Sequence, residues 1–127
     1  MSTNREGHLC ADVTTGSGDT QLFRVTNGLE FYVLLGSYRI DASNGKGKEF
    51  YIQLPGDIES GSFNLGLSPR GPMIIHVTGS SEAEVYQGNL ELKVGGDAQF
   101  AGTFSGIDIH GLKVTNGSFR LEHETSA

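Results

Sequence analysis

The histidines and their neighbouring carboxylates are the residues of this sequence that come nearest to a chemical site. Asp108 and His110 are two positions apart in a segment that alternates like a β-strand, so their side chains share a face. A hairpin after them would bring His123 close to His110, which makes these three residues candidates for a metal or proton-transfer site. None of the four histidines has the short spacing of metal ligands, so a solvated strand face explains the group better. We therefore expect no bound metal and no cofactor.

Motifs for nucleophilic or phosphate chemistry are not found in the sequence. Residues 66–71 are one residue too long for the G-x-S-x-G nucleophile turn and precede no helical pattern. Residues 45–48, Gly-Lys-Gly-Lys, lack the spacing of a phosphate-binding loop. Cys10 has no neighbouring base to activate its thiol, so we expect a small, half-buried apolar side chain. We predict no catalytic residues.

Two sets of side chains are candidates for contact with a ligand or partner. In the first, Tyr51 lies on the polar face of its strand, opposite Asp41 and diagonal to Arg39, with Gln53 next on the same face. A tyrosine among polar groups on a sheet can bind a sugar or an organic ligand, although cross-strand packing explains the arrangement better. The sequence has no tryptophan, which weakens an analogy to sugar-binding sandwiches.

The second set is a pair of like charges. A two-residue turn at residues 116–117 would place Lys113 directly opposite Arg120. Like charges in opposed positions destabilise a sheet, so the pair needs a compensating anion. Either a neighbouring carboxylate such as Glu122 or an acidic ligand would supply it.

The overall charge and hydropathy exclude several partners. The 127-residue chain carries 9 basic and 15 acidic residues, a net charge of −6, so we expect no nucleic-acid partner. The longest apolar run, residues 31–35, is far too short to span a membrane. Because residues 1–7 are polar, no signal peptide is predicted, which indicates a cytoplasmic protein as the sequence stands, or an exported one if its N-terminus was trimmed.

The elements that must position these residues are β-strands. Nineteen glycines separate short segments of period-two alternation, and only residues 80–86 suggest a helical turn. We predict one domain over residues 1–127, with loose ends at 1–6 and 123–127. The expected fold is an antiparallel β-sandwich or flattened barrel of about eight to ten strands, with a closed lipocalin-like barrel as the alternative. The predicted strands cover residues 8–13, 21–25, 29–35, 37–42, 48–54, 61–66, 73–77, 89–94, 98–105, 107–115 and 118–122.

Turn lengths follow from the rule that opposed residues share a face. The rule favours a two-residue turn at 116–117 and three-residue loops at 45–47 and 95–97. The 45–47 loop sets Ile40 opposite Ile52, with a type I turn that ends in a bulge. A phase break near Gly111 predicts a bulge there.

Recurrent glycine–aromatic motifs give the sequence a family resemblance. Gly-Ser-Phe at 61–63, Gly-Asn-Leu-Glu-Leu at 88–92, Gly-Thr-Phe at 102–104 and Val-Thr-Asn-Gly-Ser-Phe at 114–119 carry it. Over residues 29–121 the chain resembles small bacterial all-β domains of unknown function that occur in predicted lipoproteins and exported proteins. The resemblance implies a fold and supplies no catalytic residues.

Three classes of function stay open on these grounds. A non-catalytic binding or interaction module, with a small ligand or a protein as its partner, is favoured. A structural subunit that assembles through sheet edges comes second. An enzyme with an unrecognised site comes last, because no acid–base or nucleophile constellation emerges.

Overall fold

The computed structural model describes residues 3–26, 28–66 and 71–123, and these form antiparallel β-strands without a helix. This confirms the predicted all-β class. The strands are β1 (Thr3–Arg5), β2 (Gly7–Thr14), β3 (Thr20–Val25), β4 (Leu29–Leu34), β5 (Ser37–Ser43), β6 (Lys48–Pro55), β7 (Gly61–Leu65), β8 (Met73–Thr78), β9 (Ser81–Val94), β10 (Phe100–Asp108) and β11 (Lys113–Leu121).

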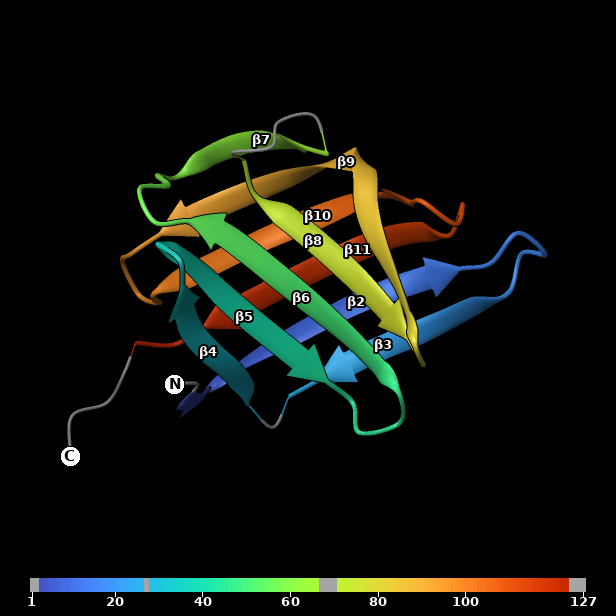
Figure 1. Ribbon diagram of the computed structural model, residues 1–127, viewed down its shortest axis with the longest axis horizontal. Coiled ribbons are helices and arrows are strands. Elements are labelled where there is room, and N and C mark those ends of the chain that lie inside the picture. The colour runs from blue at the N-terminus through green and yellow to red at the C-terminus, as the bar shows by residue number, and fades with distance from the viewer. Residues whose placement is uncertain (1–2, 27, 67–70, 124–127) are drawn as a thin grey trace.

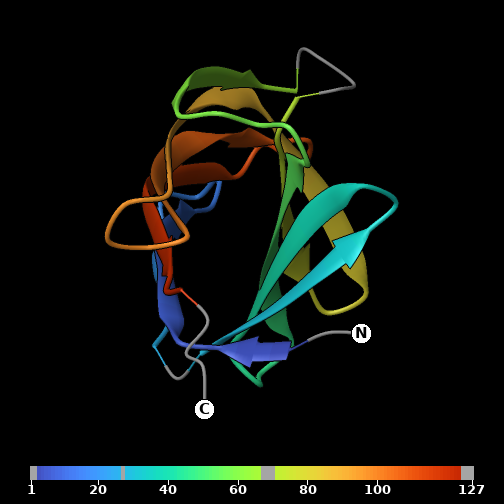
Figure 2. The ribbon, with the colours of Figure 1, turned by 90° about the vertical axis from the view of Figure 1, so that its left-hand side faces the viewer.

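The strands form a flattened barrel with two broad walls, as Figures 1 and 2 show. Strands β1, β4, β5, β6 and β8 and the start of β9 make the first sheet. The rest of β9 continues into the second sheet, where it pairs with β7 and β10, and β11, β2 and β3 follow. The chain also passes from the first sheet to the second between β1 and β2. Among the described residues, no helix is long and apolar enough to cross a membrane.

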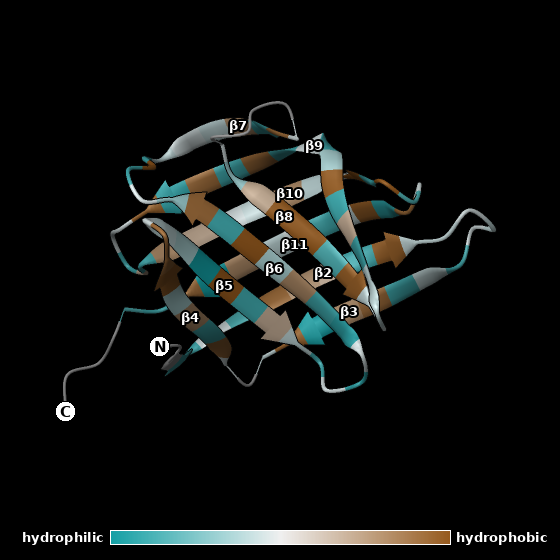
Figure 3. Cartoon of the chain, viewed as in Figure 1, coloured by the Kyte–Doolittle hydropathy of each residue, from teal (hydrophilic) through white to brown (hydrophobic). Residues whose placement is uncertain are grey.

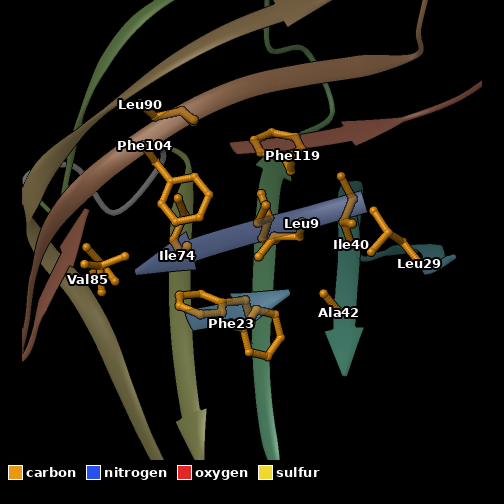
Figure 4. Packing of buried hydrophobic residues seen from close by; sticks show 14 of the residues in the cluster. Leu9, Phe23, Leu29, Ile40, Ala42, Ile74, Val85, Leu90, Phe104 and Phe119 are labelled. Carbon is orange, nitrogen blue, oxygen red and sulfur yellow. The ribbon is translucent and has the colours of Figure 1, made fainter. Parts of the chain in front are cut away.

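The core lies between the two sheets, where alternate side chains of every long strand meet (Figure 4). Phe50 of the first sheet contacts Phe23 edge-on, with ring centroids 5.0 Å apart, and lies 6.0 Å from the ring of Phe104. The C-terminal strands contribute several large apolar side chains to this core, and Leu112 beside them is half-buried. The buried ones are Phe100, Phe104, Val114, Phe119 and Leu121.

The pair Asn116-Gly117 forms a bulge inside β11, and the predicted two-residue turn is wrong. β11 runs through the pair with β10 on one side and β2 on the other. Its register with β2 shifts between Thr115 and Ser118, so one extra residue of β11 is accommodated there. Asn116 takes the left-handed conformation, with φ at 53°, which asparagine tolerates better than most residues.

The hairpin between β10 and β11 turns at residues 109–112 instead. The Asp108 amide donates to the Leu112 carbonyl at 3.0 Å, and the Gly111 amide donates to the Asp108 carbonyl at 2.9 Å. Gly111, where a bulge was predicted, therefore belongs to the turn, and its φ of 83° suits glycine. The bulge and the turn have exchanged places relative to the prediction.

The other predicted turns have mixed outcomes. The 45–47 loop is confirmed, since Ile40 pairs with Ile52, but the positive φ of Gly45 rules out a type I turn. The 95–97 loop is longer than predicted, because Val94 pairs with Phe100. The helical turn predicted at 80–86 is wrong, because β9 begins at Ser81.

The chain ends also differ from the prediction of loose termini. Residues 3–5, which that prediction included, form β1 and pair with β4. Arg5 is buried and donates to the carbonyl of Glu122 at 2.7 Å. Residues 1–2 and 124–127 lie outside the described residues.

The recurrent glycine–aromatic motifs interlock across β10 and β11. Gly102 pairs with Phe119, and Phe104 pairs with Gly117, so each glycine faces the phenylalanine of the other motif. A Cβ atom at Gly117 would lie 2.5 Å from the Phe104 ring, and one at Gly102 would lie 2.8 Å from the Phe119 ring. Glycine at these positions leaves room for the rings, which gives these two copies of the motif a packing reason.

Candidate functional site

The outer face of the first sheet gathers most of the polar residues expected to contact a ligand. Arg39 of β5 pairs with Gln53 of β6, and Asp41 of β5 pairs with Tyr51 of β6, as the 45–47 loop predicts. Their chain neighbours alternate into the core, where Ile52 is fully buried. Figure 3 shows this alternation as bands of opposite hydropathy along β5 and β6. Strand pairing therefore holds Arg39, Gln53 and Tyr51 on one face above a packed core.

Arg39 is the centre of a small cluster on this face. Its Nε donates to Asp41 Oδ1 at 2.9 Å, and its guanidinium lies 4.2 Å from the centroid of the Tyr51 ring. The Tyr32 ring of β4 lies on the other flank, 5.9 Å from the guanidinium. The hydroxyl of Tyr32 donates to Asp41 Oδ2 at 3.3 Å, and the hydroxyl of Tyr51 donates to Glu49 Oε2 at 2.9 Å. We call these five residues the arginine–tyrosine cluster.

The cluster changes the proton affinity of its own members. Burial raises the pKa of Tyr51 to about 12, and the hydrogen bond to Glu49 adds to this effect. Burial also raises the pKa of the Asp41 carboxyl, and the opposing hydrogen bond and charge of Arg39 offset only part of that shift. The Tyr51 hydroxyl therefore stays protonated throughout the physiological range and donates its hydrogen bond to Glu49.

The cluster lies within a larger acidic surface of the first sheet. One cross-strand row runs through five strands in register, from Glu30 through Asp41, Tyr51 and Ile75 to Glu84. Its centre is aromatic and aliphatic, and both of its ends are acidic. Neighbouring rows add Glu49 opposite Val77 and Gln53 opposite Met73. We call this surface the acidic sheet face; it comprises the five residues of the arginine–tyrosine cluster together with Glu30, Met73, Ile75, Glu82 and Glu84.

Most carboxylates of the acidic sheet face are not neutralised. Asp41 has its ion pair with Arg39. Among the described residues, no ion pair includes Glu30, Glu49, Glu82 or Glu84. Arg39 is thus the single described cation in the arginine–tyrosine cluster, and the face as a whole is negative.

Lys113 and Arg120 do not face each other, which corrects the second expected contact site. Both lie on β11, where Lys113 pairs with Ile107 of β10 and Arg120 pairs with Ala101. Arg120 instead forms an ion pair with Glu122, with Nε and Oε2 2.5 Å apart. The expected like-charge repulsion, and the need for an outside anion to relieve it, disappear because residues 116–117 continue the strand.

The three metal candidates, Asp108, His110 and His123, do not come together as one site, because His123 lies apart from the other two. Asp108 is buried at the end of β10, and the exposed His110 hydrogen-bonds with Ser81 Oγ at 3.2 Å. His123 follows the other end of β11 and donates to the Gly96 carbonyl at 2.8 Å. Within residues 3–26, 28–66 and 71–123, no group of three or more His, Cys, Asp or Glu side chains is arranged to hold a metal ion.

Asp108 pairs instead with His76, a contact that sequence reasoning missed. His76 Nδ1 donates to Asp108 Oδ2 at 3.3 Å, and both side chains are almost fully buried. The other carboxylate oxygen accepts the amides of His110 and Leu112 at 2.9 and 3.0 Å, which ties it to the 109–112 turn. The His76 ring stacks on Phe50 with centroids 4.8 Å apart. The pair joins residues 32 positions apart, so no local spacing signals it.

A small cleft adjoins this pair at one end of the barrel. Its volume is about 130 Å³, and its lining includes Phe23, Lys48, His76 and Thr78. Lys48 Nζ donates to Gln21 Oε1 across the gap between β6 and β3. Burial lowers the pKa of His76 despite the opposing effect of Asp108, so the imidazole is mostly neutral near pH 7. We call this the histidine cleft.

Comparisons of the chain with protein-family models, with curated proteins and with solved structures found no match. The two sites described above differ in shape. The acidic sheet face is broad, because it is built of residues in register on adjacent strands of the first sheet. The histidine cleft is small and partly enclosed by side chains of both sheets. These shapes suit different partners.

Proposed function

We propose that this protein is a non-catalytic binding module whose acidic sheet face docks a partner. More particularly, the partner is a basic protein segment that also carries apolar side chains. The observation that carries the proposal is the in-register row from Glu30 to Glu84, with Tyr51 and Ile75 at its centre and carboxylates at its ends. An apolar centre within a charged rim is the arrangement typical of protein interfaces.

The charge of the face supports a basic partner over an acidic one. Glu82 and Glu84 have no ion-pair partner among the described residues, so cations of a docked segment can pair with them without displacing an existing contact. The net charge of −6 would draw a basic partner toward the protein over longer distances. An anionic ligand at Arg39 would instead have to compete with Asp41 and approach a negative surface.

The arginine–tyrosine cluster supplies rigidity to this proposed site. Arg39 is held by Asp41 and stacked on Tyr51, so the Tyr51 ring is in place before a partner arrives. Side chains that are ordered in the free protein lose little conformational entropy on binding. The described contacts therefore favour a preformed docking surface.

The test is a titration of the isotope-labelled protein with a short synthetic peptide of alternating lysine and leucine, followed by NMR. We expect the amide signals of β5, β6 and β8 to shift. The double variant Glu82→Gln/Glu84→Gln should weaken binding roughly tenfold, equivalent to about 1.4 kcal/mol. Added salt should weaken binding as well, because the contacts are between exposed charges.

A matched control variant distinguishes an effect of the acidic sheet face from an effect of the protein's net charge. Asp57 and Glu59 are exposed in the loop before β7, so Asp57→Asn/Glu59→Gln removes the same charge elsewhere. This variant should leave the peptide affinity within about twofold of the parent. Equal weakening by both double variants, or signal shifts confined to the second sheet, would contradict the proposal.

A further inference from the structure

The histidine cleft has the parts of a second binding site, unrelated to the acidic sheet face. Val13, Phe23 and Leu112 supply apolar walls, and Thr15 and Thr78 supply hydroxyl groups. A cavity of about 150 Å³ in another protein holds a benzene molecule. The 130 Å³ cleft is therefore large enough for a ligand of about six non-hydrogen atoms.

The orientation of His76 leaves one ring nitrogen for such a ligand. Nδ1 is turned to Asp108, whose carboxylate is fixed by the amides of His110 and Leu112. No described residue hydrogen-bonds with Nε2, the nitrogen on the opposite edge of the ring, and His76 lines the cleft. In neutral histidine this Nε2 is an acceptor, and when the ring is protonated it becomes a donor.

The charges around the cleft select the sign of the ligand. Among the residues that line the cleft, Lys48 carries a positive charge and His76 can gain one by protonation. The groups that act on His76 electrostatically are Asp108, Lys48 and His110. Asp108 is already occupied by three hydrogen bonds, so its carboxylate is not free for a cationic ligand. An anion in the cleft would lie between the Lys48 ammonium and the His76 ring, and would favour protonation of that ring.

We infer that the histidine cleft binds a short-chain monocarboxylate, with its carboxylate between Lys48 and His76 and its alkyl end against Phe23. Binding takes up a proton at His76, so affinity rises as the pH falls from 8 toward 6. Asp108 acts as a positioning residue that holds the ring in the orientation that presents Nε2. The inference does not depend on the acidic sheet face, which lies on the outside of the first sheet.

Butyrate is the probe for this inference, and butyramide, its neutral isostere, is the ligand control. The titration is followed by NMR of the histidine side chains, with sodium chloride added to keep the ionic strength constant. We expect saturable shifts of the His76 ring signals with butyrate, with an affinity at least tenfold higher than for butyramide. We also expect tighter butyrate binding at pH 6 than at pH 8.

Two lysine variants localise the effect. Lys48→Gln removes the cation of the cleft, whereas Lys46→Gln removes one from the exposed tip of the 45–47 loop. Only Lys48→Gln should weaken butyrate binding, by about tenfold, and neither should unfold the protein, because neither side chain is fully buried. Equal affinity for butyrate and butyramide, equal effects of the two variants, or no His76 shift up to 100 mM butyrate would each overturn the inference.

Discussion

Two aspartates of this protein, each hydrogen-bonded to a basic side chain, show how burial changes what one kind of contact does. Arg39 and Asp41 lie 2.9 Å apart on the outer face of the first sheet, with side chains 19% and 18% exposed. His76 and Asp108 lie 3.3 Å apart in the barrel interior, at 3% and 0%. The outer pair can exchange its partner for water, whereas the inner pair cannot. The inner pair therefore governs stability, and the outer pair holds the Tyr51 ring in place.

The two pairs should differ most in how much stability the protein loses when the aspartate of each pair is removed. Asp108→Ala should lower the free energy of unfolding by about 3–5 kcal/mol, because it leaves His76 and two turn amides without their acceptor. Asp41→Ala should cost below about 1 kcal/mol, as partly exposed pairs usually do. Urea unfolding of both variants measures the difference, and equal losses would contradict the contrast drawn between the two pairs.

The pH dependence of stability should sharpen the contrast through His76. Because its pKa is lower in the folded state than in the unfolded chain, the unfolded chain binds more protons as the pH falls below the ordinary value near 6.5. The stabilisation is therefore present above pH 6.5 and is lost as the pH falls through that value toward the lower pKa of the folded state. Urea unfolding between pH 7.5 and 5.5 should show this decline.

The variant His76→Phe isolates this contribution. Phenylalanine preserves the stacking on Phe50 but cannot take up a proton. The variant should show a flatter stability profile than the parent between pH 7.5 and 5.5, whatever its absolute stability. Parallel profiles would mean that His76 has the same pKa in the folded and unfolded states.

The smallest expected effect concerns Tyr51 in the outer cluster. Its pKa of about 12 depends in part on the hydrogen bond to Glu49, so Glu49→Gln should move the last phase of an ultraviolet titration to lower pH. Tyr51→Phe should remove that phase altogether and thereby assign it. If Glu49→Gln leaves the titration unchanged, burial alone accounts for the raised pKa.

Much of the acidic sheet face could be predicted from the sequence, because it depends on one short loop. The 45–47 loop and the alternation around it determine that Tyr51 lies opposite Asp41 and near Arg39. Ile75 and Glu84 could not be added in this way. Their row requires β8 beside β6 and a turn into β9, where the sequence suggested a helical turn.

The histidine cleft could not be predicted, for a different reason. His76 lies in a run of apolar residues, Met-Ile-Ile-His-Val, so alternation does not show which face it occupies. Its partner Asp108 lies in an alternating segment, and this pattern predicts a solvated face. Only the packing of β10 against β9, with the turn at 109–112, places Asp108 inside.

The sequence by itself determined the class of fold and, within single strands, which side chains share a face. It could not decide between a turn and a bulge at Asn116-Gly117. A two-residue hairpin and a single extra residue in a strand both bring Val114 and Phe119 to the same face, so their alternation patterns agree. The tertiary structure decided the matter because β10 and β2 pair with β11 on both sides of the bulge, and a hairpin there would leave those ladders broken.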